Sequence, residues 1–225
     1  MSATRDTTGR LAVPDRAQRE DLAGFVGRAV RLDAAVVVRL RARPGDRPAV
    51  EAWAATPFDA LVTRAAPGTL EPADVTVVGS DLLAALAVAS GETVEPGTPV
   101  DDRWRGPLPP LRPDARWQVV GDVPAAELNR LAERGVAAAR EGDPSGRPSA
   151  ALLDQVVLTV TDDATGAEVR VPMRCVFALS GMGFVGPGAG DEDAVRVSTD
   201  GGWLRLDARG GAVVRRRRAQ LPLAL

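Results

Sequence analysis

The side chains able to do chemistry are few, because the chain contains no histidine, lysine or tyrosine. All 28 of its basic residues are arginine. The polypeptide therefore offers no imidazole base, no Schiff-base lysine and no phenolic acid. Cys175 and Ser180 have no such base to activate them, and the apolar neighbours of Cys175 predict a buried, unreactive thiol. We assign no catalytic residue and favour a protein that is not an enzyme.

Carboxylates are the remaining candidates for acid–base or metal chemistry. They occur in three clusters, at residues 101–102, 162–163 and 191–193. Each cluster falls in a predicted loop or turn, and none has the spacing of a calcium-binding loop. One cysteine without any histidine cannot make a standard zinc site. We expect no metal and no cofactor, although a carboxylate-only or Mg²⁺-dependent hydrolase, such as a glycosidase, stays as an alternative.

A glycine motif, Gly181-Met-Gly-Phe-Val-Gly186, matches the GxGxxG pattern of dinucleotide-binding folds. In those folds a helix follows the glycines and faces the pyrophosphate. Here the next predicted strand begins at Ala194, the eighth residue after Gly186, whereas a crossover with its helix takes about ten to twelve residues. We interpret the motif as a loop between strands and expect no nucleotide there.

The strongest charge cluster consists of Arg215, Arg216, Arg217 and Arg218. Consecutive arginines are suited to contact an acidic or phosphorylated partner, and we predict a partner-binding site at these four residues. The alternative interpretation is an edge strand whose charges prevent pairing with another strand.

The composition predicts a folded chain, with 45% hydrophobic and 26% charged residues. A net charge of −2 disfavours broad binding to phosphates, so we expect a protein or small anionic ligand as partner rather than nucleic acid. The N-terminus shows no apolar signal segment, and the longest apolar run, residues 82–89, is far short of the roughly 20 residues that span a bilayer. With a single cysteine, this predicts a soluble, cytoplasmic protein without membrane contact. The oligomeric state stays open.

The apolar spacing predicts helices and short antiparallel strands on both sides of a proline-rich stretch. Trp104 and Trp117 flank that stretch, and we expect them to pin it to the domains. Residues 174–180 fit either a strand or a short helix. In the first half, the expected elements are a helix over 14–31, a hairpin over 34–43 and 48–54, strands over 58–64 and 74–78, and a helix over 82–89. In the second half, they are a strand over 117–120, a helix over 124–140, a hairpin over 154–161 and 167–172, and strands over 194–198, 203–207 and 212–217.

These elements predict an α+β fold of two small, possibly duplicated units, each a helix plus antiparallel strands. The duplication is suggested by Val13-Pro14 and Val123-Pro124, which each open a helix that leads to a hairpin. We align residues 58–68 with residues 177–188 as the apolar segments that follow. The predicted domains are a disordered tail over 1–12, an N-terminal α+β domain over 13–89, a proline-rich linker over 90–113 and a C-terminal α+β domain over 114–225.

The C-terminal half also resembles a known group of proteins. Pro172-Met-Arg-Cys-Val-Phe177 and Asp200-Gly-Gly-Trp-Leu-Arg-Leu206 are similar to uncharacterised proteins of GC-rich actinobacteria, whose domains have no assigned function. The resemblance implies no activity. We therefore hypothesise a non-enzymatic binding or interaction protein, with the carboxylate hydrolase and a structural subunit of a larger complex as the two alternatives.

Overall fold

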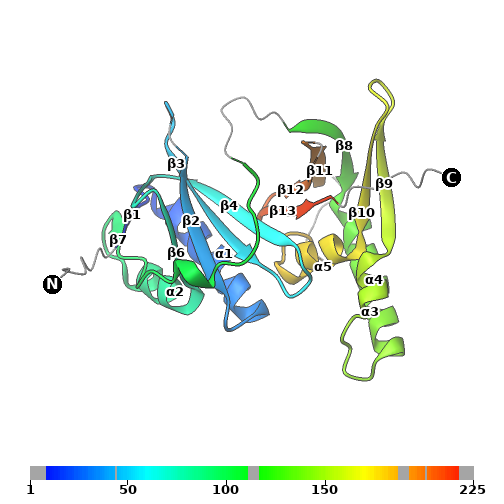
Figure 1. The fold of residues 1–225 in the computed structure, drawn as a ribbon, viewed down its shortest axis with the longest axis horizontal. Coiled ribbons are helices and arrows are strands. Elements are labelled where there is room, and N and C mark those ends of the chain that lie inside the picture. Colours follow the sequence, from blue (N-terminus) through cyan, green and yellow to red (C-terminus); the bar gives the residue numbers. More distant parts are fainter. Residues whose placement is uncertain (1–8, 44, 111–116, 187–192, 201, 218–225) are drawn as a thin grey trace. The chain divides into compact units, whose positions relative to one another are not determined.

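The computed structural model describes residues 9–43, 45–110, 117–186, 193–200 and 202–217 (Figure 1). Over these residues the predicted α+β class with antiparallel sheets is confirmed. The chain divides into unit 1, with residues Met1–Pro57 and Val62–Leu108, and unit 2, with residues Phe58–Leu61 and Pro109–Leu225. No helix in the described ranges is long and apolar enough to cross a membrane.

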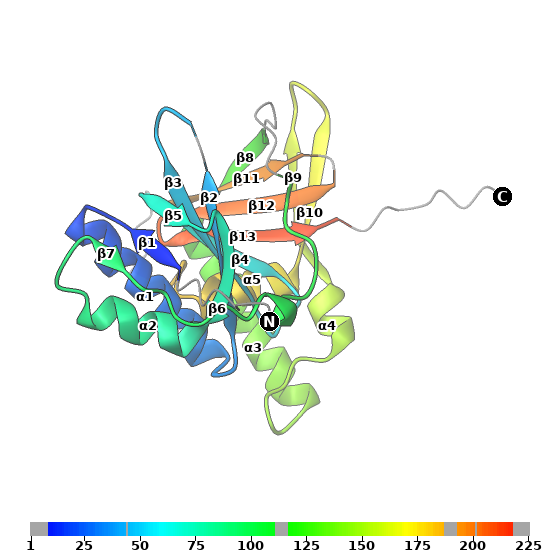
Figure 2. The ribbon, with the colours of Figure 1, turned by 60° about the vertical axis from the view of Figure 1, so that its left-hand side comes forward.

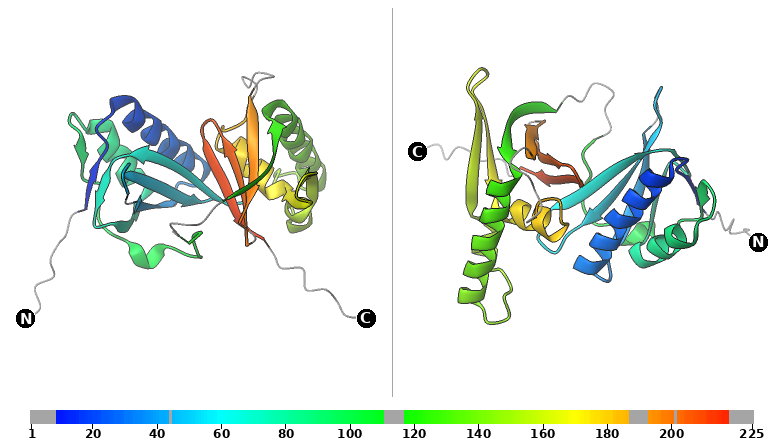
Figure 3. Two further views of the ribbon diagram at one scale, coloured as in Figure 1. Left: turned by 90° about the horizontal axis from the view of Figure 1, so that it is seen from above. Right: turned by 180° about the vertical axis from the view of Figure 1, so that it is seen from behind.

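Unit 1 is built from antiparallel strands and packed helices. Strands β6, β2, β3 and β4 are neighbours in that order, and a smaller sheet has the order β5-β1-β7. Helices α1 and α2 contact each other and lie side by side in Figure 3. The elements are β1 (Arg10–Ala12), α1 (Arg16–Leu32), β2 (Val37–Arg43), β3 (Ala49–Ala55), β4 (Leu61–Pro67), β5 (Thr69–Glu71), β6 (Asp74–Val78), α2 (Gly79–Val88), β7 (Thr93–Val94) and the 3₁₀ turn η1 (Asp101–Arg103).

The sequence explains these elements locally. Helix α1 begins where the Asp15 carboxylate accepts a hydrogen bond from the Gln18 amide (2.8 Å), which satisfies a backbone donor at the helix start. Strand β2 alternates, because successive side chains of a strand face opposite sides. Leu40 is fully buried, whereas its neighbours Arg39 and Arg41 form ion pairs with carboxylates on adjacent strands. Of the predicted tail, residues 1–8 lie outside the described residues, and residues 10–12 form β1.

Residues 90–108, which belong to the predicted linker over 90–113, carry structure of their own in unit 1. Strand β7 pairs with β1, and the Val100 amide donates to the Thr76 carbonyl oxygen (2.7 Å). Asp101 accepts a hydrogen bond from the Thr76 amide (2.6 Å). Trp104 lies under the guanidinium group of Arg39, 5.9 Å from its ring centroid. This tryptophan thus holds its segment against the sheet, as expected from the sequence.

Gly68 lies between β4 and β5, where two backbone segments approach closely. Its amide donates a hydrogen bond to the Pro48 carbonyl oxygen (3.1 Å). A Cβ atom at this position would lie 2.2 Å from the Ala12 carbonyl oxygen. Any side chain at residue 68 therefore has to push backbone atoms apart.

We expect Gly68→Ala to lower the free energy of unfolding by about 1–3 kcal/mol, because the added methyl group overlaps backbone that cannot rotate away. Chemical denaturation of the purified variant measures this loss. Gly91→Ala is the matched control, since a Cβ atom at Gly91 meets nothing within 4 Å. Equal losses in the two variants would show that the close approach at Gly68 is not the cause.

Unit 2 contains a sheet, a separate hairpin and helices. Strands β13, β12, β11 and β8 are neighbours in that order, and β9 pairs with β10; Figure 2 shows β11, β12 and β13 side by side. Trp117 stacks under Arg205 of β12, 5.6 Å from its ring centroid. The elements are β8 (Gln118–Pro124), α3 (Ala125–Gly142), α4 (Ala150–Asp154), β9 (Val156–Asp162), β10 (Ala167–Pro172), α5 (Met173–Gly181), β11 (Ala194–Thr199), β12 (Trp203–Ala208) and β13 (Gly211–Arg216).

Residues 174–180, which fit either a strand or a short helix in the sequence, form part of helix α5. Every residue from Met173 to Leu179 is buried, so the segment shows neither the one-sided helical pattern nor the alternation of a half-exposed strand. Helix α5 packs against α3 as α2 packs against α1, and each short helix starts directly after a strand. The repeat in the structure therefore matches α5 with α2, and not with residues 58–68 as the sequence alignment has it.

Candidate functional site

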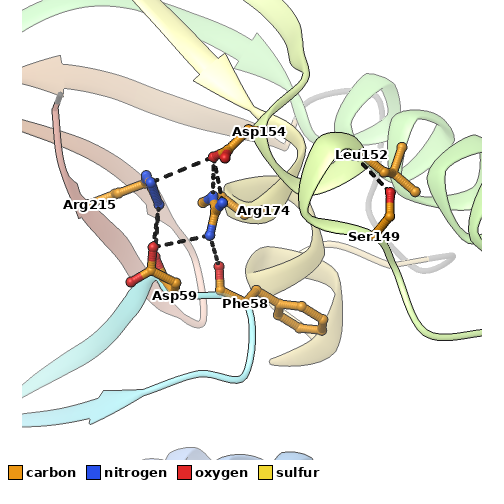
Figure 4. Close-up of polar contacts among 7 residues, drawn as sticks. All are labelled: Phe58, Asp59, Ser149, Leu152, Asp154, Arg174 and Arg215. Carbon is orange, nitrogen blue, oxygen red and sulfur yellow. Dashed lines mark hydrogen bonds and ion pairs between the residues drawn. The ribbon is translucent and has the colours of Figure 1, made fainter.

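Two nearly buried arginines and two aspartates meet in unit 2 (Figure 4). Arg174 comes from the first turn of α5 and Arg215 from β13. Asp154 ends α4, and Asp59 lies in the segment Phe58–Leu61 that belongs to this unit. We call these four residues the unit 2 network.

Arg174 is the centre of the unit 2 network. Its Nε and Nη2 atoms donate to Asp154 Oδ1 at 3.1 and 2.5 Å. Its Nη1 atom donates to the Phe58 carbonyl oxygen (2.9 Å) and to Asp59 Oδ2 (3.1 Å). Arg215 Nη1 donates to the Asp59 carbonyl oxygen (2.9 Å) and to Asp59 Oδ2 (3.2 Å). The two guanidinium groups therefore share both carboxylates.

Local structure places the two aspartates. The Ser149 hydroxyl accepts a hydrogen bond from the Leu152 amide (3.2 Å) and so caps α4, which brings Asp154 to the end of that short helix. Asp59 has a φ of 56°, a left-handed conformation that aspartate tolerates better than most residues. A helix cap and a left-handed turn residue are common local structures. Neither one marks Asp154 or Asp59 in the sequence as part of a site.

The charges of the unit 2 network suit a structural role better than acid–base catalysis. The side chains of Arg174 and Arg215 are 6% and 11% exposed, whereas that of Asp59 is 77% exposed. Burial lowers the pKa of Arg215, the nearby charge of Arg174 lowers it further, and the two aspartates oppose this shift. An arginine keeps its proton in a protein, so neither Arg174 nor Arg215 supplies a general acid or a general base.

Cys175 follows Arg174 in α5 and is fully buried, as predicted. Burial raises the pKa of its thiol to about 12, although the charges of Arg215 and Arg174 act in the opposite direction. A thiol with this pKa carries almost no thiolate near neutral pH, and the thiolate is the nucleophile. The cysteine therefore behaves as a small core residue.

The described members of the arginine run, Arg215 to Arg217, do not form one patch. Arg215 points into the unit 2 network, while Arg216 is exposed. Arg217 donates to Thr199 Oγ1 (3.3 Å) and to the Glu168 carbonyl oxygen (3.2 Å), and Arg218 lies outside the described residues. The alternation of strand β13 separates Arg215 from Arg216, because neighbouring side chains face opposite sides of a sheet. A partner contact at these residues stays a prediction.

Two aspartates of the predicted carboxylate clusters, Asp101 and Asp162, accept hydrogen bonds from backbone amides. Asp101 accepts from the Thr76 amide in unit 1. Asp162 accepts from the Thr165 hydroxyl and the Ala164 amide at the β9–β10 turn, and the hydroxyl is the main cause of its lowered pKa. Residues 191–192 lie outside the described residues. Asp101 and Asp162 thus stabilise a strand edge and a turn, each by accepting backbone hydrogen bonds.

A second group of arginines lies along one side of α1 in unit 1. Asp21, Gly24, Arg28 and Arg31 follow at spacings of three and four residues, which places them on one stripe of the helix. Arg64 of β4 forms an ion pair with Asp21. Burial lowers the pKa of Arg28, the charges of Arg64 and Arg31 lower it further, and Asp21 opposes the shift. We call Arg28, Arg31 and Arg64 with Asp21 the α1 arginine cluster.

Comparison with known families agrees with the two-part organisation of the chain. Residues 6–106 match the family model described as domain of unknown function DUF8010, and residues 112–220 match that of domain of unknown function DUF8185. Neither description names an activity, as the sequence resemblance implied. No curated protein matches the chain.

Solved structures with a similar fold are DNA polymerase sliding clamps. The clamp of Bacillus subtilis is 12% identical, with a TM-score of 0.56 over 96% of this chain. A putative DNA polymerase III beta subunit of Eubacterium rectale is 10% identical with a TM-score of 0.55, and that of Thermotoga maritima is 14% identical with a TM-score of 0.52, each over 95% of this chain. The chain spans 66% of the length of each of these proteins. At these identities the likeness establishes a similar fold.

The fold corrects one expectation from the sequence. The net charge of −2 disfavoured nucleic acid as a partner, and that expectation is contradicted, since the similar structures are DNA polymerase clamps. The physical reason is that a net charge sums the whole chain, whereas phosphates respond to the local field of a surface.

Proposed function

We propose that the chain is a non-enzymatic, clamp-like protein that associates with duplex DNA and with proteins acting on it. The observation that carries the proposal is the fold, which follows DNA polymerase sliding clamps over 95–96% of the chain. The chain spans 66% of the length of those proteins. A clamp-like role for this chain is therefore a proposal drawn from the shared fold. A cytoplasmic location fits this role and fits a lone cysteine kept reduced.

The available chemistry supports an interaction protein over the hydrolase alternative. Histidine, lysine and tyrosine are absent from the sequence. The converging carboxylates of unit 2, Asp59 and Asp154, are engaged by Arg174 and Arg215. A glycosidase instead needs two carboxyl groups that face the substrate from opposite sides, whereas Asp59 and Asp154 both face arginine side chains.

We also propose that Arg216 contributes to contact with a partner. It follows Arg215 on β13 but is exposed, so its charge is available at the surface. Arg217 lies beside it and already donates to the Glu168 carbonyl oxygen. Arg216 is therefore the member of the predicted arginine run that best suits a role at an interface.

Binding to duplex DNA tests the proposed function directly. We expect micromolar affinity for a labelled duplex at about 50 mM salt, weakening at least about tenfold at about 200 mM, because bound arginines release counterions from the phosphates. Fluorescence anisotropy measures both values. If the protein shows no binding at about 100 µM and low salt, the proposed role on DNA is wrong.

The sliding part of the proposal has a separate readout. A clamp that slides leaves DNA through an open end, so blocking the free end of a surface-tethered duplex after loading should slow dissociation several-fold. A protein held only by electrostatic contacts dissociates equally fast from open and blocked duplexes. Equal dissociation would therefore restrict the function to ordinary DNA binding and reject the clamp-like mode.

A further inference from the structure

The segment Phe58–Leu61 belongs to unit 2, although unit 1 supplies the chain on both sides of it. Two residues separate the end of β3 from this segment, and its last residue begins β4. Both strands are anchored in unit 1, since Trp53 of β3 is 1% exposed and Val62 of β4 is fully buried. Two residues span at most about 7 Å, so unit 1 restricts both ends of the segment. We call Phe58–Leu61 the 58–61 turn.

Hydrogen bonds and a ring contact hold the 58–61 turn in unit 2 (Figure 4). The Phe58 carbonyl oxygen accepts from Arg174 Nη1 and the Asp59 carbonyl oxygen accepts from Arg215 Nη1, each at 2.9 Å. Asp59 Oδ2 accepts from both guanidinium groups, at 3.1 and 3.2 Å. The Phe58 ring also lies 5.6 Å from the Phe177 ring of α5, measured between the ring centroids.

The hydrogen bonds of the 58–61 turn depend on both units. Unit 1 restrains the backbone of the turn, whereas unit 2 supplies the two nearly buried guanidinium groups. Unfolding of unit 1 frees the ends of the turn and so weakens its hold on the arginines, and unfolding of unit 2 removes the donors. Each unit thus stabilises the other through the turn, in the way that a bound partner stabilises a folded protein.

We propose that the 58–61 turn couples the two units, so that in the native protein they open together and neither opens alone. Asp59 is the central residue of this coupling, because its carboxylate contacts Arg174 and Arg215 at once. A partner that binds one unit then stabilises the other as well, since opening of either unit breaks the same hydrogen bonds. The coupling holds whether or not the protein associates with DNA.

Hydrogen exchange followed by peptide mass spectrometry measures the opening of both units in the unmodified protein. The amides to compare are the slowest to exchange in β2 and β3 of unit 1 and in β12 and β13 of unit 2, because core strands open only in the largest events. We expect the protection factors of the two sets to agree within about fivefold, since one event exposes both. A larger difference in the wild-type protein would show that the units open separately, and the proposal would be wrong.

Asp59→Gly removes the shared carboxylate but keeps the turn, because glycine adopts the left-handed φ of 56° without strain. We expect the two sets of protection factors to differ by more than about fivefold in this variant, since the less stable unit then opens on its own. A fivefold difference corresponds to about 1 kcal/mol, which is less than one hydrogen bond to a charged group usually contributes. Protection factors that fall together would assign the coupling to another part of the chain.

Asp163→Gly is the matched control, because Asp163 is also an exposed aspartate in a turn of unit 2. Its two sets should agree within about fivefold, as in the wild-type protein. The same separation in both glycine variants would show that any added flexibility divides the units. If Asp59→Gly fails to fold, Asp59→Asn replaces it, since asparagine tolerates the turn and keeps a neutral acceptor oxygen; the same separation is expected and the same outcome rejects the coupling.

A cavity in unit 2 gives an independent readout. Val197 of β11 is fully buried, and Val197→Ala should lower the protection of the β2 and β3 amides at least about fivefold, although these strands belong to unit 1. In a chain that also carries Asp59→Gly, this effect on unit 1 should be at least about threefold smaller. Equal effects with and without Asp59 would reject the 58–61 turn as the coupling element.

Discussion

Replacing Arg174 with methionine is expected to lower the free energy of unfolding by about 1.5–3 kcal/mol, the usual net contribution of hydrogen bonds to charged groups. The arginine side chain is 6% exposed and donates to Asp154, to Asp59 and to the Phe58 carbonyl oxygen. Methionine fills much of the volume but donates no hydrogen bond. The Phe58 carbonyl oxygen and the Asp154 carboxylate then lose a hydrogen-bond donor.

Chemical denaturation followed by circular dichroism measures this effect. Arg170→Met is the matched control, because Arg170 is 54% exposed and pairs with Glu168 at the surface. An exposed pair of this kind contributes about 0–1 kcal/mol. If the two variants lose the same stability, the unit 2 network contributes no more than a surface pair, and its structural role is rejected.

The thiol of Cys175 is expected to react at least about 1000-fold more slowly in the native protein than in the unfolded chain at pH 8. The pKa of the thiol rises from 9.0 to about 12 on burial, and three pH units correspond to about 1000-fold less thiolate. Steric protection in α5 slows the reaction further. The rate of modification by a thiol reagent, with and without denaturant, measures the ratio, and comparable rates would show that the thiol is accessible.

The same burial makes stability fall at high pH. The folded state holds the thiol proton up to about pH 12, whereas an unfolded thiol loses it near 9.0. The contribution of the neutral thiol is therefore complete below about pH 9 and decreases by about 1.4 kcal/mol per pH unit above it. Cys175→Ala lacks this titration, so its stability should fall less steeply between about pH 9 and 10.5. Parallel curves would exclude the cysteine as the cause.

Local patterns predicted most of the regular elements. The hairpin β9–β10 and strands β11, β12 and β13 lie close to their expected ranges, because short turns and alternation act within a few residues. The smaller sheet β5-β1-β7 was not predicted, since its three strands are two or three residues long and come from distant parts of the chain. Such short strands carry too little pattern to stand out.

The candidate sites were harder to find in the sequence than the elements. Asp59, Asp154, Arg174 and Arg215 come together only through the fold, and nothing local marks the two aspartates as partners of these arginines. Arg174 did carry a signal, because it is a charge within a run of apolar residues. The run of four arginines was conspicuous, but strand geometry turns its first member inward. Overall charge also hid the stripe on α1, which becomes visible only when spacing along the helix is considered.

The segment Phe58–Leu61 limits how this protein can be dissected. It lies between residues assigned to unit 1 on both sides, yet it belongs to unit 2 and supplies Asp59 to two guanidinium groups there. A fragment that starts near residue 112, where the second family match begins, leaves that carboxylate behind. Truncation at the boundary suggested by family matching would therefore leave Arg174 and Arg215 with Asp154 as their only carboxylate in the unit 2 network. A fragment that keeps this network intact also needs residues Phe58–Leu61.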